Sequence, residues 1–431
     1  MIRRSLCFLL FAALALLQAR PATAQVQAAK YQSGLANELR ALVETPAVSG
    51  HEQAVTSQIT GLLAGHHPQT DNLGNVIVTL GSGAPHRLIV APVDEPGFIV
   101  GGINGRGYLT LQRLPQGGNL PLFNELYSAE PVKIETAQHG WINGAVAGIS
   151  IHLLPQREHP PNMAELDNMY VDVGATTAAE ARASGADVLS PLAIDRRFYE
   201  MANGQWTSPA IGDRFGVAAL LEVVRHLDPA KIKGTLTIAF VTQQWLGARG
   251  LQRVIESQKP DELIYVGRLV RPPALPRVAA ASASEGGPIF SVQPGSGVLI
   301  ATERTEGNLT GLPAELKQLA AEHNINLKTD VSAPLLPRGG YLPQPKLPVR
   351  TVHLAVATAW PSTPAEFIDG HDVASVIELL EDYLQGAAAK IELAPAHGLA
   401  EPLPPTKPGS PPSNAAILKS LVETYGASSH E

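Results

Sequence analysis

The residues that follow the predicted strands are the first candidates for chemistry, because open α/β sheets bind ligands at the carboxyl ends of their strands. Those that could line such a site are Pro92, Asp94, Glu95, Gln244, Trp245, Gly267 and Ser362. Hydrolysis at a pair of metal ions needs about six nitrogen or oxygen ligands and a general base for the attacking water. Only Asp94 and Glu95 qualify for such roles. We therefore expect a site that is poor in metal ligands.

The elements that position these residues follow from hydrophobic periodicity. Apolar residues at helical spacing predict helices over residues 35–43, 53–63, 215–227, 248–257, 312–322 and 373–384. Short apolar runs predict strands over residues 75–80, 88–93, 236–242, 263–266 and 349–355. The alternation of strands with helices predicts an α/β fold whose largely parallel sheet is covered on both faces.

Two segments differ in composition from the α/β part. Residues 98–194 consist of short Val, Ile and Leu runs that Gly interrupts every few residues, which predicts an inserted small all-β domain. This insertion would divide the α/β domain into residues 25–97 and 195–388. Residues 389–431 are rich in Pro and end in a polar stretch, and we interpret them as a mobile tail.

Residues 1–24 have the pattern of a signal peptide, with a basic start, an apolar run over residues 6–17 and a small-x-small motif at residues 22–24. We therefore expect a periplasmic or secreted protein. The one cysteine, Cys7, lies in this segment, so the mature chain would form no disulfide. No later apolar run is long enough for a membrane span. The net charge of -7 and the lack of a basic cluster exclude nucleic acid as an expected partner.

The order of seven motifs resembles that of the tetrahedral (TET) aminopeptidases, which include glutamyl and deblocking aminopeptidases and proteins once called cellulase M. The motifs are SGHE (49–52), DNLGN (71–75), DEPGF (94–98), YVDVGA (170–175), DRFG (213–216), QQWLGARG (243–250) and STPAEFID (362–369). The resemblance covers nearly the whole mature chain. It implies a zinc-peptidase-like mixed sheet flanked by helices. It also implies an enzyme that uses two divalent metals, typically zinc or cobalt, to remove N-terminal residues from peptides.

The same resemblance implies that the chemical groups have been replaced. The family's metal-binding histidine, bridging aspartate, general base, glutamate ligand, aspartate ligand and final histidine fall on Pro92, Gly212, Gln244, Trp245, Gly267 and Ser362. Pro and Gly have no side-chain donor, Trp only donates, and neutral Gln cannot take a proton from water. In the family, the aspartate at Asp94 orients the missing histidine. Asp213 lies one residue after the bridging position.

These observations predict an exported pseudopeptidase with no catalytic residue and no bound metal. Its vestigial pocket would consist of Pro92, Asp94, Glu95, Gly212, Asp213, Gln244, Trp245, Gly267 and Ser362, with Gln244 at the degenerate position of the general base. The pocket would bind a peptide, a glycan or a protein, or the chain would have a structural role. We expect all the replaced positions, together with Asp94, to surround one cavity.

Three alternatives stay open at this point. The chain could be an active binuclear metallo-aminopeptidase whose ligands lie elsewhere in the sequence. Trp245 could fill the vacated metal space or offer a surface on which a ligand stacks. The resemblance also implies dimer contacts through the inserted β-domain, which would make the protein a homo-oligomer.

Overall fold

The structure of the chain is a computed structural model that describes residues 30–114, 124–147, 165–270, 292–303, 309–336, 345–386, 388–394 and 413–423. The predicted signal peptide, residues 1–24, lies outside the described residues. The chain divides into two compact units, residues 1–394 and residues 395–431. The candidate site belongs to the first of these units.

The first unit is built on an eight-stranded mixed sheet. Its strands are, in spatial order, β16 (Leu327–Val331), β15 (Val298–Thr302), β17 (Arg350–Val356), β14 (Glu262–Val266), β4 (His86–Pro92), β13 (Thr235–Val241), β3 (Val76–Gly81) and β2 (Gln69–Thr70). The central four, β17, β14, β4 and β13, run parallel to one another. Because parallel neighbours end at the same edge, the residues after β14, β4 and β13 are brought together there.

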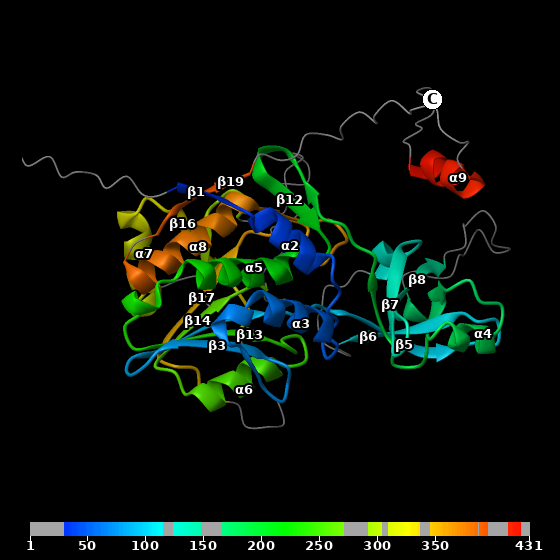
Figure 1. Cartoon of the computed structure of the whole chain (residues 1–431), viewed down its shortest axis with the longest axis horizontal. Helices are drawn as coiled ribbons and strands as arrows, with labels where there is room; N and C mark the ends of the chain where they lie inside the picture. The colour runs from blue at the N-terminus through cyan, green and yellow to red at the C-terminus, as the bar shows by residue number, and fades with distance from the viewer. Residues whose placement is uncertain are drawn as a thin grey trace, which may run out of the picture. The chain divides into compact units, whose positions relative to one another are not determined.

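Helices cover both faces of this sheet (Figure 1). They are α2 (Leu35–Val43), α3 (Gln53–Leu62), α5 (Ile211–His226), α7 (Leu312–Glu322) and α8 (Gly370–Gln385) on one face and α6 (Arg249–Gln258) on the other. The alternation of strand side chains explains the two layers: Ile89 packs in the larger core with α5, whereas Leu88 packs in the second core with α6. The predicted α/β class, with a mixed sheet flanked by helices, is confirmed.

The first turn of α5 departs from the sequence prediction. We expected this helix to begin at residue 215, but it begins at Ile211, directly after Ala210 in a left-handed conformation with φ 56°. Gly, Asp and Arg in this turn resemble a polar loop in sequence. In the structure these residues are buried, and Gly212 and Asp213 belong to the first turn of α5.

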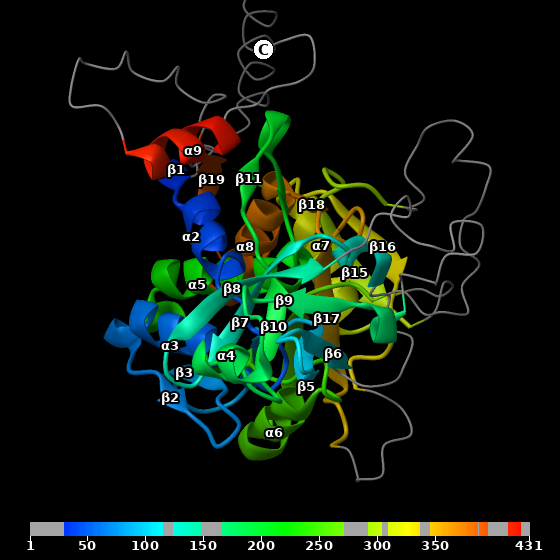
Figure 2. The same cartoon turned by 90° about the vertical axis from the view of Figure 1, so that its right-hand side faces the viewer.

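The inserted β-domain is a closed barrel with the strand order β10-β5-β6-β9-β8-β7 (Figure 2). Its strands are β5 (Gly97–Ile103), β6 (Leu109–Leu114), β7 (Pro131–Thr136), β8 (Gly140–Ala147), β9 (Tyr170–Asp172) and β10 (Pro191–Ile194). Alternating residues such as Phe98, Val100 and Leu192 fill its interior. The domain is not purely β, because α4 (Ala178–Ala183) interrupts it after the Thr177 N-cap.

Two small sheets complete the described residues of this unit. Strands β11 (Tyr199–Glu200), β12 (Gln205–Ser208) and β18 (Glu366–Asp369) form one, and β1 (Lys30–Ser33) pairs in parallel with β19 (Lys390–Leu393). The predicted tail boundary at residue 389 is therefore too early, because β19 is held by backbone pairing with β1. The second unit contains α9 (Asn414–Glu423). Among the described residues, no helix combines the length and the hydropathy needed to cross a bilayer.

Candidate functional site

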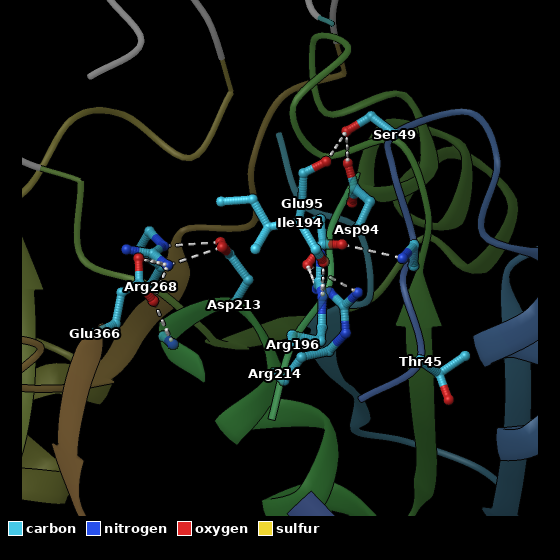
Figure 3. Close-up of polar contacts among 12 residues, drawn as sticks. Thr45, Ser49, Asp94, Glu95, Ile194, Arg196, Asp213, Arg214, Arg268 and Glu366 are labelled. Carbon is cyan, nitrogen blue, oxygen red and sulfur yellow. Dashed lines mark hydrogen bonds and ion pairs between the residues drawn. The ribbon is translucent and has the colours of Figure 1, made fainter. Parts of the chain in front are cut away.

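Asp94 joins the ends of two neighbouring parallel strands. It lies two residues after β4, and its Oδ1 and Oδ2 accept hydrogen bonds from the backbone N–H groups of Gln244 (2.8 Å) and Trp245 (3.0 Å), which follow β13. Ser49 Oγ donates a third hydrogen bond to Oδ2 at 2.5 Å (Figure 3). Burial raises the pKa of Asp94, and these three hydrogen bonds oppose the rise. Asp94 is thus a fully bonded acceptor.

Pro92 and Gly267 pack closely against each other at the ends of β4 and β14. A Cβ atom on Gly267 would lie 3.0 Å from Cδ of Pro92 and 2.8 Å from Cε1 of Tyr265. Both separations are shorter than ordinary van der Waals contacts. The proline ring therefore fills part of the region in which a side chain at position 267 would begin. The residue types at positions 92 and 267 are thus coupled by packing.

Gly212 and Ser362 meet at the carboxylate of Glu366. The backbone N–H of Gly212 donates to Oε2 at 3.0 Å, and the backbone N–H of Ser362 donates to Oε1 at 2.5 Å. Ser362 holds a left-handed conformation with φ 64°. A Cβ atom on Gly212 would lie 3.0 Å from Thr358 Oγ1. Glu366 thus ties the first turn of α5 to the loop that precedes β18.

The central cation of this region is Arg268, directly after Gly267. Its Nε and Nη2 donate to the two carboxylate oxygens of Asp213, each at 2.8 Å, and Nη2 also lies 2.7 Å from both oxygens of Glu366. The exposed fractions of Arg268, Asp213 and Glu366 are 6%, 4% and 1%. Burial alone would lower the pKa of Arg268, but the two carboxylates raise it above the ordinary value. Figure 3 shows the three side chains pointing toward one another.

Glu95 lies in a second buried ion cluster, with Arg196 and Arg214. It accepts hydrogen bonds from Arg196 Nη1 (2.5 Å) and the backbone N–H of Ala47 (3.1 Å), and Arg214 Nη2 lies 3.4 Å away. Although burial opposes the change, Arg196 and Arg214 lower the pKa of Glu95. Because Arg196 follows the barrel strand β10, Glu95 connects the barrel segment to the α/β core.

Glu52 adds a carboxylate that the sequence did not single out as a site residue. Its Oε1 accepts from the backbone N–H groups of Gly50 (2.7 Å) and Gln243 (2.9 Å). Burial, with a contribution from the charge of Asp94, raises the pKa of Glu52 to about 7. Gln243 has φ 55°, so Glu52 stabilises a left-handed residue immediately before Gln244.

The cavity next to these residues is small. Its volume is about 40 Å³, and it is lined by Glu95, Asp213, Ser362, Glu366 and ten other residues, most of them from the barrel segment and the turn before α5. Of the positions expected to surround one cavity, only Ser362 lines this one. Pro92 packs closely against Gly267, and Arg268 packs closely against Gly212. Trp245 is half-buried, unlike a filler sealed in the core. Among the described residues, no group of three or more His, Cys, Asp or Glu side chains is arranged to hold a metal ion.

Comparison with known proteins assigns the family. The family model described as M42 glutamyl aminopeptidase matches residues 74–379. SgcX of Escherichia coli strain K12, which is named as an aminopeptidase, is 26% identical over 371 residues, which cover 84% of this chain and 96% of that protein. The glutamyl aminopeptidase of Lactococcus lactis is 29% identical over 53% of this chain and 64% of its own length.

Solved structures of aminopeptidases share the fold. APDkam598 of Desulfurococcus kamchatkensis superposes with a TM-score of 0.67 at 21% identity and covers 82% of this chain and 95% of its own. The TET1 peptidase of Pyrococcus horikoshii has a TM-score of 0.67 at 20% identity, with 81% and 99% covered. Because the M42 model matches more than half of the residues, the chain belongs to the M42 glutamyl aminopeptidase family.

Proposed function

We propose that this chain is a pseudopeptidase of the M42 family, which keeps the fold but neither holds two metal ions nor hydrolyses peptides. The observation that carries the proposal is the position of Arg268. Its guanidinium group lies between Asp213 and Glu366, and its Nη2 is 3.0 Å from the point at which a side chain on Gly212 would begin. In the resemblance that point belongs to the carboxylate bridging both metals. A fixed cation therefore lies beside the position that carries the metal-bridging carboxylate in the family.

The residues present do not fit a pair of divalent metals. Pro92, Gly212 and Gly267 offer no side-chain ligand, and the indole of Trp245 only donates. Gln244, at the position of the general base, is neutral and cannot accept a proton from water. A hydrolytic metal site needs several nitrogen or oxygen ligands with open coordination for water. We therefore derive no hydrolytic step for this chain.

The carboxylates that remain are committed to other partners. Asp94 accepts three hydrogen bonds from Ser49, Gln244 and Trp245, and both oxygens of Asp213 are bonded to Arg268. Glu366 accepts from Arg268 and from two backbone N–H groups. Metal binding at these groups would require breaking buried hydrogen bonds, each of which is costly to lose.

The role that remains is binding or structural, in an exported protein cleaved after residue 24. The signal-like pattern of residues 1–24 supports export. A cavity of about 40 Å³ is close to the volume of a single water in the liquid, so a peptide, glycan or protein partner would contact the surface around the site. A homo-oligomer through the barrel is supported by the TET1 peptidase, which is described as assembling into a tetrahedron or an octahedral shell.

The second candidate is an active metallo-aminopeptidase. It is favoured by the relatives, which carry aminopeptidase names, including lysyl and glutamyl aminopeptidases. The test is the metal content of the purified protein by elemental analysis, together with hydrolysis of aminoacyl chromogenic substrates in the presence of Zn²⁺, Co²⁺ or Mn²⁺. The lactococcal glutamyl aminopeptidase, assayed in parallel, is the positive control. We expect neither stoichiometric metal nor turnover. Metal-dependent hydrolysis that a chelator abolishes would reject the pseudopeptidase and establish this second candidate.

A further inference from the structure

We propose that Arg268 is a tethered replacement for the family's metal ions: its guanidinium group supplies the positive charge that Asp213 and Glu366 require and holds three segments of the site together. The inference rests on the proposed metal-free site. It goes beyond it by assigning a positive role to a residue that no ligand pattern identifies.

The first support is connectivity. Arg268 follows β14, Asp213 lies in the first turn of α5, and Glu366 begins β18. The three residues are separated by at least 55 positions in sequence, and the four charge-assisted hydrogen bonds of 2.7–2.8 Å join them at one point. A metal bridged by carboxylates performs the same function of joining distant segments. Arg268 therefore supplies a positive charge in place of the metals and also joins the segments that the metals would join.

The second support is electrostatic. Two buried carboxylates near each other repel and are costly to desolvate unless a cation compensates them. Arginine suits this position because its planar guanidinium presents several N–H donors in a rigid fork, whereas lysine is a point charge. Nε and Nη2 of Arg268 each donate a hydrogen bond to the carboxylate of Asp213, and Nη2 also donates to Glu366. The arrangement uses the geometry that only arginine provides.

The third support is steric. A Cβ atom on Gly212 would lie 3.0 Å from Nη2 and 3.1 Å from Cζ of Arg268, tighter than nine in ten real Cβ contacts. An aspartate at position 212 would therefore require the guanidinium group of Arg268 to move from its present position. Gly212 is the residue that makes room for the guanidinium, so the loss of the bridging aspartate and the position of Arg268 are one structural change.

The test begins with the full-length chain and the Arg268→Ala variant, compared by thermal unfolding. Removing one partner of a buried ion pair is strongly destabilising, so we expect the Tm to fall by at least about 3 °C. Arg182→Ala is the control, because Arg182 pairs with Asp187 and both side chains are exposed, so this arginine loses less on truncation. Millimolar guanidinium chloride should raise the Tm of Arg268→Ala above that in potassium chloride of the same concentration. It should not raise the Tm of the wild-type protein or of Arg182→Ala.

A second variant keeps the proposal falsifiable if Arg268→Ala does not fold. Arg268→Met combined with Asp213→Asn and Glu366→Gln removes the cation and both charges with little change of volume. If Arg268 acts as a counter-charge, this triple variant should fold and recover at least half of the Tm lost in the single variant Arg268→Met. The proposal would be overturned if the triple variant regained less than half of the lost Tm or failed to fold. It would also be overturned if the Tm of Arg268→Ala fell by less than about 3 °C.

The outcomes for Arg268 are separate from those for the proposed function. Stoichiometric metal in the wild-type protein would overturn the metal-free site and this inference with it. An absence of metal together with an unchanged Tm in Arg268→Ala would overturn only the inference about Arg268.

Discussion

Gly267 and Pro92 pack closely against each other at the ends of β14 and β4, so a side chain added at position 267 tests this packing. Adding one methyl group at position 267 places a Cβ 2.8 Å from the buried Tyr265 ring and 3.0 Å from Cδ of Pro92. Overpacking of this kind costs about 1–3 kcal/mol. We expect Gly267→Ala to lower the free energy of unfolding by that amount. Pro92→Ala on its own removes two ring carbons, Cγ and Cδ, from a buried strand end and should also be destabilising.

The double variant Pro92→Ala with Gly267→Ala separates the linked packing from two independent losses. Shortening Pro92 makes room for the new methyl group, so the double variant should be more stable than the sum of the single changes predicts, by about 0.5–2 kcal/mol. Urea denaturation followed by circular dichroism measures all four free energies. Gly234→Ala is unsuitable as a control because Gly234 also lacks space, whereas Gly61→Ala, with nothing within 4 Å, is matched in chemistry. Additive costs at positions 92 and 267 would refute the idea that the two residues share one space.

Three further predictions follow from the buried charges. Burial holds the folded-state pKa of Glu52 at about 7, above its ordinary value of 4.5, so its stabilising contribution is complete at low pH and is lost as the pH rises through 7. Relative to Glu52→Gln, the wild-type protein should therefore lose about 2–3 kcal/mol of unfolding free energy between pH 5 and pH 8 in urea titrations; a flat difference would contradict this. Glu95→Gln should cost about 3–5 kcal/mol, because it leaves Arg196 and Arg214 without their counter-charge, and limited proteolysis should cut the barrel segment sooner than in wild type. With Arg268 retained, we expect no zinc binding by calorimetry after the family residues are restored at positions 92, 212, 244, 245, 267 and 362. Zinc uptake with Arg268 intact would disprove the steric conflict between Arg268 and an aspartate at position 212.

Much of the fold could be predicted because its main elements are periodic in sequence. The helix expected over residues 312–322 is α7 without any change of boundary, and the strand expected over residues 236–242 is β13 shifted by one residue. Short elements were missed where pairing, and not composition, stabilises them. Strand β18 has four residues and pairs with β12, and β19 lies in a Pro-rich region and exists through its pairing with β1. Such contacts join residues that are far apart in the chain.

The sequence could predict which expected ligand positions carry other residues, but it could not predict which side chains contact one another at the site. Motif residues beside positions 92, 212, 244 and 362 fixed the register of the resemblance, so the residue at each expected ligand position could be identified. Arg268 was adjacent to one of them, yet nothing in the sequence states that its side chain turns toward Asp213 and Glu366. Glu95 was expected in the vestigial pocket and does line the cavity, but its carboxylate is held by Arg196, which is 101 positions away. Partners of buried charges depend on the tertiary fold, which a local pattern does not contain.

In the pseudopeptidase that we propose, buried carboxylates that no longer face metal ions need another partner for their charge. When ligands disappear but Asp213 and Glu366 stay buried, the protein needs either protonated carboxyl groups or another cation. The neighbouring cluster already shows the second solution, since Arg196 and Arg214 compensate Glu95. Arg268 applies the same solution at Asp213 and Glu366, and the absence of a side chain at Gly212 gives it room. A basic residue beside a vanished ligand position, with a glycine at the bridging position, is therefore a better sign of a stable metal-free site than the missing ligands alone.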